Sequence, residues 1–317
     1  MSDLLVFLLT TPPEPLSITS PADLWQASCA RSAAFTSPID RAVAGGFLAD
    51  RLGYAFAAGY GAALHALAKG RLPEDRLVAF CATEDKGAHP RDIHTSLAEA
   101  PDGKLLVRGK KLWATLAPEA TELLIVVSIG ADEKAKNRLR VVRVPASAPG
   151  VKIVPMPPPP FAPEIPHAEV ELAGAVVHEE DVLPGDGYDD YLKPFRTIED
   201  VFVHAALLGY LVGVGRRSGW PKEVIERLIM AVVAARSIAE RDPKSPATHV
   251  ALAGLLEETR AIEASAGDLW GLASEEERRR WERDKALLSV ASKAREARRG
   301  RAWEALSAAR KEEIERA

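Results

Sequence analysis

The sequence predicts an α+β protein in which helices at both ends flank a β-rich middle section. The two ends predict helices because long stretches rich in Ala and Leu are broken only by short Gly/Pro segments. The middle section differs, because short runs of branched apolar residues are separated there by turn signals such as Pro101-Asp102-Gly103. We expect three domains, namely N-terminal helices over residues 1–75, a β-domain over residues 76–190 and a helical bundle over residues 191–317.

The segment Ala42–Ala68 predicts a buried helix. It is dense in Ala, Leu and aromatic residues and carries few charges, so it is apolar on most sides. Its glycines Gly53, Gly59 and Gly61 each cost about 1 kcal/mol relative to Ala, and close packing against another helix would explain them. The apolar run Leu4–Leu9 is too short to cross a membrane and predicts a buried N-terminal segment.

The middle section predicts a compact β-domain of sandwich or barrel type. Apolar and polar residues alternate in two of its runs, as they do in half-buried strands. The run Pro157–Pro160 fits neither a central strand nor a helix, so it predicts a stiff surface connection. The expected strands are residues 77–82, 104–107, 123–128, 139–144, 151–154 and 168–172.

Long helices with short connections predict a bundle after residue 196. Ser274 and Glu277 form a capping-box pattern, which places a helix start. In the last helix, apolar residues such as Trp281 and Leu306 stand among many charges, so one face packs and the rest is solvated. The expected helices are residues 199–214, 221–240, 247–272 and 274–310.

The composition excludes several classes of protein. With 317 residues, 47% of them hydrophobic, the chain can bury a large core without a disulfide or metal. The 41 basic and 45 acidic residues argue against nucleic-acid binding through bulk positive charge. Cys29 and Cys81 form no CxxC pair, which excludes a thiolate zinc site and suits a reducing compartment. We expect a soluble cytoplasmic protein with neither nucleic-acid nor membrane partners.

A search for catalytic motifs finds no complete active site. The sequence has no HExxH zinc motif, no GxSxG elbow, no phosphate loop and no GxGxxG after a strand. The segment His178-Glu179-Glu180-Asp181 offers metal-ligand residue types, but adjacent residues on one loop rarely converge on an ion. We therefore expect a solvated turn there and no metal site. Spacing alone leaves the function open.

Three stretches, taken in order, resemble the acyl-CoA dehydrogenase family of flavoproteins, and the likeness extends over about residues 40–302. The stretch Ala79–Thr95 resembles the family's strand and Thr-Glu-Pro-Gly-Ala-Gly-Ser-Asp loop. The stretch Gly109–Thr115 fits the family's Gly-x-Lys-x-Trp-Ile-Thr pattern. The stretch Ala168–Gly187 resembles the strand and valine-proline segment that leads back to the C-terminal bundle.

The resemblance implies a fold that encloses FAD and an acyl-CoA thioester. It places Thr83 against the flavin, while Trp113 and Thr115 cover and hydrogen-bond the isoalloxazine. An aromatic wall excludes water, and hydroxyls bond the polar edge of the ring. The alternative is a core tryptophan at a strand end and two ordinary strand threonines. Arg241 stands where the family's Arg-x-x-Phe-Gly motif reaches the FAD of a neighbouring subunit, which implies a homo- or hetero-oligomer.

The implied reaction removes a proton next to the thioester carbonyl and passes a hydride from the next carbon to flavin. It needs a carboxylate base in a dry pocket, where burial raises the pKa. Most members place this glutamate after a Gly-Gly-x-Gly segment, which has no counterpart in this sequence. Others place it ten residues before a glycine in the first bundle helix, where this chain has Glu199 and Gly209. The alternative for Glu199 is a glutamate favoured near a helix N-terminus by the helix dipole.

Departures from the family pattern keep two functions open. His89-Pro90-Arg91 replaces the phosphate-holding Gly-Ser, and Asp200 replaces the arginine of the Glu-Arg pair. The first hypothesis is an FAD-dependent acyl-CoA dehydrogenase of fatty acid metabolism. The second is a non-catalytic member that acts as a partner subunit of a heteromeric dehydrogenase or as a scaffold. The sequence sets neither the acyl chain length nor the oligomeric state.

Overall fold

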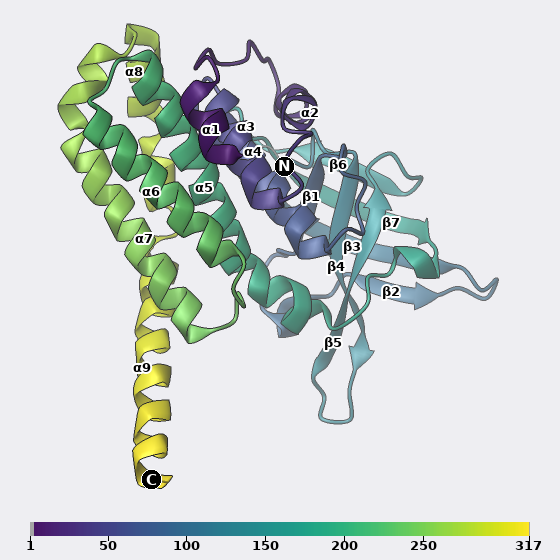
Figure 1. Ribbon diagram of the computed structural model, residues 1–317. Helices are drawn as coiled ribbons and strands as arrows, with labels where there is room; N and C mark the ends of the chain where they lie inside the picture. Colours follow the sequence, from purple (N-terminus) through teal and green to yellow (C-terminus); the bar gives the residue numbers. More distant parts are fainter. Residues whose placement is uncertain (1–2, 317) are drawn as a thin grey trace.

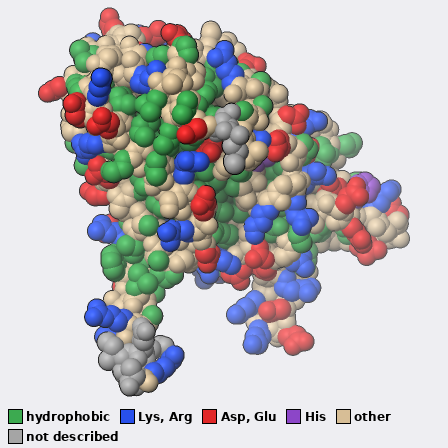
Figure 2. Space-filling model, in the orientation of Figure 1, with side chains coloured by type: hydrophobic (Ala, Val, Ile, Leu, Met, Phe, Trp, Pro, Cys, Tyr) green, Lys and Arg blue, Asp and Glu red, His purple; other side chains and the backbone are tan. Residues whose placement is uncertain are grey.

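The computed structural model describes residues 3–316, without the side chains of residues 312–315. Figure 1 shows the N-terminal helices between a C-terminal helical bundle on one side and a β-sheet on the other. The long helix α9 (Ser292–Arg316) runs along the bundle and then projects beyond it. Acidic and basic side chains are interspersed over the face of the molecule that Figure 2 shows.

The N-terminal part consists of the helices α1 (Leu4–Thr10), α2 (Pro21–Arg31), α3 (Pro38–Leu48) and α4 (Leu52–Ala68). The side chain of Ser20 caps α2 by accepting a hydrogen bond from the amide of Asp23. Helix α4 is buried along nearly all its length, as the sequence predicted, and ends where Lys69 adopts the left-handed conformation. The run expected as a buried N-terminal segment is α1, with Leu4 and Leu8 in the core.

The middle part is one seven-stranded mixed sheet that curls. The strand β4 pairs with β1 in parallel and with β5 antiparallel, and a single parallel pairing, Ser96 with Ser128, joins it to β2. From β2 the sheet continues through β3 and β7 to β6. The strands are β1 (Val78–Cys81), β2 (Ser96–Glu99), β3 (Leu105–Thr115), β4 (Glu122–Ala131), β5 (Asn137–Pro145), β6 (Val151–Pro155) and β7 (His167–Val177).

All six expected strands are present, and β2 was missed. The four residues of β2 include only one large apolar side chain, Leu97, so the segment has no strand signal of its own. Pairing with β3 makes it a strand. The proline run Pro157–Pro160 has no regular structure and crosses the surface between β6 and β7, as predicted.

The C-terminal part begins with a π-helical segment, Gly187–Leu192, that continues directly into α5. Helix α5 and its lead-in are apolar and long enough to cross a membrane by composition, but 78% of the apolar window is buried inside the protein. The core therefore accounts for its character. The helices are α5 (Lys193–Arg217), α6 (Lys222–Ala239), α7 (Pro246–Ser265), α8 (Glu275–Asp284) and α9.

The predicted single helix over residues 274–310 is wrong. It begins as expected at the Ser274 capping box, but it breaks after Asp284 into a short 3-10 segment before α9. The fully buried Asp284 carboxylate accepts a hydrogen bond from the amide of Ala162 at 2.7 Å, and this long-range contact fixes the end of α8. The helix expected over residues 247–272 likewise ends at Ser265 and continues as a 3-10 segment.

Candidate functional site

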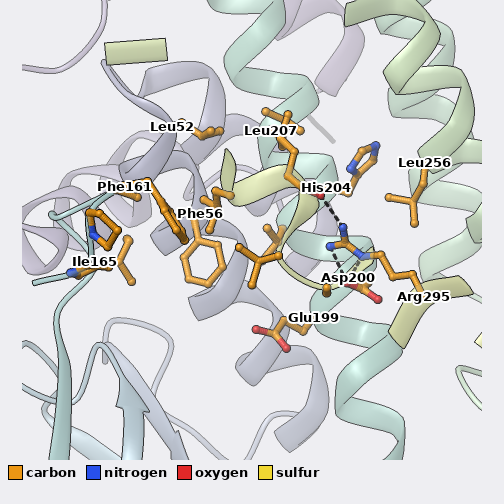
Figure 3. A pocket seen from close by; sticks show the side chains of 18 of the residues that line it. Leu52, Phe56, Phe161, Ile165, Glu199, Asp200, His204, Leu207, Leu256 and Arg295 are labelled. Carbon is orange, nitrogen blue, oxygen red and sulfur yellow. Dashed lines mark hydrogen bonds and ion pairs between the residues drawn. The ribbon is translucent and has the colours of Figure 1, made fainter. Parts of the chain in front are cut away.

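A cavity of about 590 Å³ lies where the N-terminal helices, the sheet and the bundle meet. One part of its wall is apolar and includes Leu52, Phe56 and Ile165. Another part, from α7 and α9, contributes Thr259, Arg260 and Arg295. Figure 3 shows α5 between these two parts, with Glu199 and Asp200 on one turn and His204 on the next. The proline run Pro157–Pro160 forms a further section of the wall.

Trp113 lines this cavity because β3 is interrupted just before its end. The pairing of β3 with β7 shifts between Lys111 and Ala114, and Trp113 has a φ of 55°. This β-bulge turns the indole out of the sheet, so that 60% of the residue is exposed. The indole edge meets the ring of His167, with ring centroids 6.3 Å apart. Trp113 is therefore not the core tryptophan that the alternative interpretation expected.

Glu199 lies in the second turn of α5, well inside the helix, and its side chain faces the cavity. No hydrogen bond or ion pair holds its carboxylate among the residues that the structure describes. Burial raises the pKa of Glu199 to about 7, and the neighbouring Asp200 adds to the shift, while Arg295 and Arg196 oppose it. A carboxylate of this kind can accept a proton near neutral pH.

Asp200 has the opposite surroundings, although it is the next residue. Its Oδ1 accepts a hydrogen bond from Arg295 at 2.8 Å, and its Oδ2 pairs with Arg298. All three side chains are largely buried, so the contact ties α9 to α5 at the cavity wall. In Figure 3 Asp200 points toward Arg295, and Glu199 points away from it.

Thr115 and Glu199 both lie close to the buried side chain of Tyr60. The side chain of Thr115 is close enough to the phenol of Tyr60 to lower its pKa slightly, whereas burial and the charge of Glu199 raise that pKa well above its ordinary value. The phenol also accepts a hydrogen bond from the amide of Phe80 at 3.2 Å. Thr83 contributes its carbonyl oxygen, which accepts a hydrogen bond from Leu112 at 2.8 Å.

Arg241 lies elsewhere, on the exposed turn that follows α6. It borders a separate, smaller hollow of about 270 Å³ together with Lys244 and Asp189. Arg241 therefore does not line the large cavity. Its expected contact with the FAD of a neighbouring subunit stays a prediction, because the structure contains one chain. The structure thus brings Trp113 and Glu199 to one cavity, places Thr115 close by, and keeps Arg241 apart.

Sequence analysis missed three cavity residues, His204, Thr259 and Arg295. His204 stands in an apolar helical run and matches no motif, and its partner Thr259 is 55 residues away in the sequence. These three residues come together only because α5 packs against α7 and α9 in the folded protein. Within residues 3–316, no group of three or more His, Cys, Asp or Glu side chains could hold a metal, and His178 is exposed as expected.

A sequence profile for "Acyl-CoA dehydrogenase, middle domain" matches residues 79–174, which contain β2 to β6 and most of β1 and β7. Residues 79–174 are therefore similar to the middle domain of acyl-CoA dehydrogenases. No curated protein sequence matches the chain significantly.

Solved structures show that the acyl-CoA dehydrogenase likeness extends over the whole fold. The butyryl-CoA dehydrogenase of Megasphaera elsdenii has a TM-score of 0.66 and 15% identity, over 89% of each chain. A structure described as an FAD-dependent dehydrogenase has a TM-score of 0.67 and 14% identity, over 96% of each chain. The dibenzothiophene monooxygenase of a Paenibacillus species has a TM-score of 0.60 and 16% identity, over 85% of this chain and 83% of that chain. The chain therefore has the acyl-CoA dehydrogenase fold, which also occurs in a monooxygenase.

Proposed function

We propose that this protein is an FAD-dependent dehydrogenase of acyl-CoA thioesters in which Glu199 is the base. The observation that carries the proposal is an unpaired carboxylate with a pKa of about 7 on the wall of a largely apolar cavity. A general base is most effective when its pKa lies near the working pH. Glu199 would accept the proton from the carbon next to the thioester carbonyl.

The residues around the cavity fit a flavin ring. Trp113 exposes a flat aromatic surface beside the cavity, and the proline run Pro157–Pro160 helps to close that side against water. FAD, when bound, supplies the acceptor for the hydride that leaves the next carbon. Trp113 would cover the ring, Thr83 and Thr115 would lie at its polar edge, and Arg241 would serve a neighbouring subunit.

A second candidate is a non-catalytic partner subunit or scaffold without flavin. The segment that replaces the family's phosphate-holding Gly-Ser favours it. This segment forms a short 3-10 turn, Pro90–Asp92, in which the side chain of Arg91 is 79% exposed and pairs with the adjacent Asp92. It therefore forms no enclosed cradle of backbone amides for the phosphates of FAD.

The absorption spectrum of the purified protein separates the two candidates. A flavin band, present on purification or after incubation with FAD, supports the dehydrogenase. Protein that stays colourless after incubation with FAD rejects it and leaves the partner subunit or scaffold. The same preparation shows by its sedimentation whether the chain forms the expected homo-oligomer.

Glu199→Gln tests the base directly. We expect it to slow the bleaching of flavin by an acyl-CoA by about 10²- to 10⁴-fold while the flavin spectrum is unchanged. The matched control is Glu263→Gln, because Glu263 lines the same cavity and burial raises its pKa as well. Bleaching should persist in this control. Unchanged bleaching in Glu199→Gln, or its loss in the control alone, would reject Glu199 as the base.

A further inference from the structure

His204 places a polar group in the cavity wall that the proposed proton transfer does not use. The residue lies on α5, is only 8% exposed, and lines the cavity together with Thr259 from α7. Its Nε2 lies 2.7 Å from the Oγ1 of Thr259. Among residues 3–316, no partner hydrogen-bonds its other ring nitrogen, Nδ1.

The Thr259 hydroxyl decides which nitrogen of His204 carries the proton. Its oxygen lies 3.0 Å from the carbonyl oxygen of Leu255, and we assign its single hydrogen to that bond, so that the hydroxyl accepts from His204. Nε2 therefore carries the proton, and Nδ1 presents a lone pair. Burial, helped by the charge of Arg295, lowers the pKa of His204 to about 4, so the ring is neutral at pH 7.

Nδ1 is not one of the fully buried polar atoms that lack a partner, so it reaches the cavity, where a ligand that supplies a donor can bind it. We propose that Nδ1 of His204 binds a hydroxyl group on the acyl part of the substrate, so that the cavity selects hydroxylated acyl thioesters over plain ones. The proposal takes the thioester from the proposed function, but its main readout is binding and needs no flavin.

The position of His204 relative to Glu199 on α5 indicates which carbon of the acyl chain carries the hydroxyl group. His204 follows Glu199 by five residues, which is about 7.5 Å along the helix axis and about 140° around it, so the two side chains reach different parts of the cavity. The hydroxyl therefore belongs several bonds beyond the carbon that faces Glu199. The apolar residues Phe56, Val203 and Leu207 line the same cavity and suit the methylene groups of the acyl chain.

The test compares three acyl-CoA probes of one chain length by calorimetry with the purified protein. Hexanoyl-CoA carries no polar group on its chain, 5-hydroxyhexanoyl-CoA carries a donor, and 5-oxohexanoyl-CoA carries only an acceptor. We expect the hydroxy probe to bind about fivefold more tightly than the other two, as one neutral hydrogen bond would allow. Equal affinities for the hydroxy and plain probes, or no binding of either, would overturn the proposal.

Two variants at one position separate the acceptor from the packing. His204→Gln can keep the polar contact to Thr259 but has no atom at the place of Nδ1, so the ratio of the affinities for the hydroxy and plain probes should fall from about five to about one. His204→Asn places a polar group near Nδ1 and should retain part of the preference. A preference that survives in His204→Gln would overturn the assignment.

The flavin readout tells failure of this inference from failure of the proposed function. A protein that prefers the hydroxy probe in calorimetry but never bleaches with any thioester upholds the hydroxyl site and rejects the dehydrogenase. A protein that bleaches equally with all three probes and binds them equally upholds the dehydrogenase and rejects the hydroxyl site.

Discussion

The two sides of α5 are joined to their neighbours in opposite ways. On one side α5 and α3 meet backbone to backbone. A Cβ added to Gly46 would lie 1.8 Å from the carbonyl oxygen of Ala206, and one added to Gly209 would lie 2.1 Å from that of Val43. On the other side the side chains of Arg295 and Arg298 reach from α9 to Asp200.

The difference shows which walls of the cavity are fixed and which can adjust. Backbone contact leaves no side chain that could change rotamer, so the position of α5 against α3 tolerates no added atom. Arginines have long side chains that follow small displacements of α9. Glu199 is thus carried by the rigid wall, whereas the Arg295 wall can yield to a ligand.

Gly46→Ala breaks the rigid side and should have the largest effect. The added methyl overlaps a backbone oxygen, so α3 and α5 must separate, and the free energy of unfolding should fall by about 3 kcal/mol or more. Urea denaturation measures the loss. The matched control is Gly254→Ala in α7, where an added Cβ meets nothing within 4 Å, and it should raise stability by up to about 1 kcal/mol. Equal stability of the two variants would contradict the comparison.

Asp200→Asn breaks the adjustable side with a smaller effect. It leaves two largely buried arginines without their carboxylate, and we expect a loss of about 2 kcal/mol. Urea denaturation at neutral pH measures this loss. The control, Glu257→Gln, removes an exposed surface pair with Arg260 and should change stability by less than about 0.5 kcal/mol. An equal loss of unfolding free energy in the two variants would show that the ion pairs of α9 stabilise the protein no more than an exposed pair does.

Glu199→Gln should alter how stability depends on pH. The pKa of Glu199 in the folded protein, about 7, lies above the ordinary value of 4.5 that it has when unfolded. Its protonated form therefore favours folding below pH 4.5, and this contribution is lost as the pH rises through 7. Glutamine does not ionise, so the variant should gain about 3 kcal/mol over the wild type at pH 8. Parallel stability curves between pH 5 and 8 would show that Glu199 is not buried as described.

Asp200→Asn should also move the pH profile of flavin bleaching. In the wild type the rate should rise through a midpoint near pH 7, because the base must lose its proton. Asp200 raises the pKa of Glu199, whereas Arg295 and Arg196 lower it, so removing the Asp200 charge should shift the midpoint to lower pH by up to about one unit. A shift to higher pH would mean that another group is the base.

The sequence predicted the elements whose signals are local. The buried helix α4 is apolar throughout, and the start of α8 carries its own capping box at Ser274. Resemblance to a known family added Glu199, which no local pattern separates from any other glutamate near the start of a helix. In the structure Glu199 lines the cavity, and its burial there raises its pKa.

The rest depends on contacts between distant segments. The end of α8 is set by a hydrogen bond from the amide of Ala162 to the carboxylate of Asp284, and the protonation of His204 depends on Thr259. Neither partner is visible in a sequence window. The exposure of Trp113 likewise follows from a β-bulge against β7, which only the strand register reveals.

The cavity wall is completed by residues far apart in the chain, from Leu52 to Arg295. Because chains generally fold from the N-terminus during synthesis, α4, the sheet and α5 can pack before α9 has left the ribosome. The binding site is then among the last features of the molecule to form. A ligand in the cavity would stabilise only chains on which α9 has already docked, so it would favour molecules in which this cavity is complete.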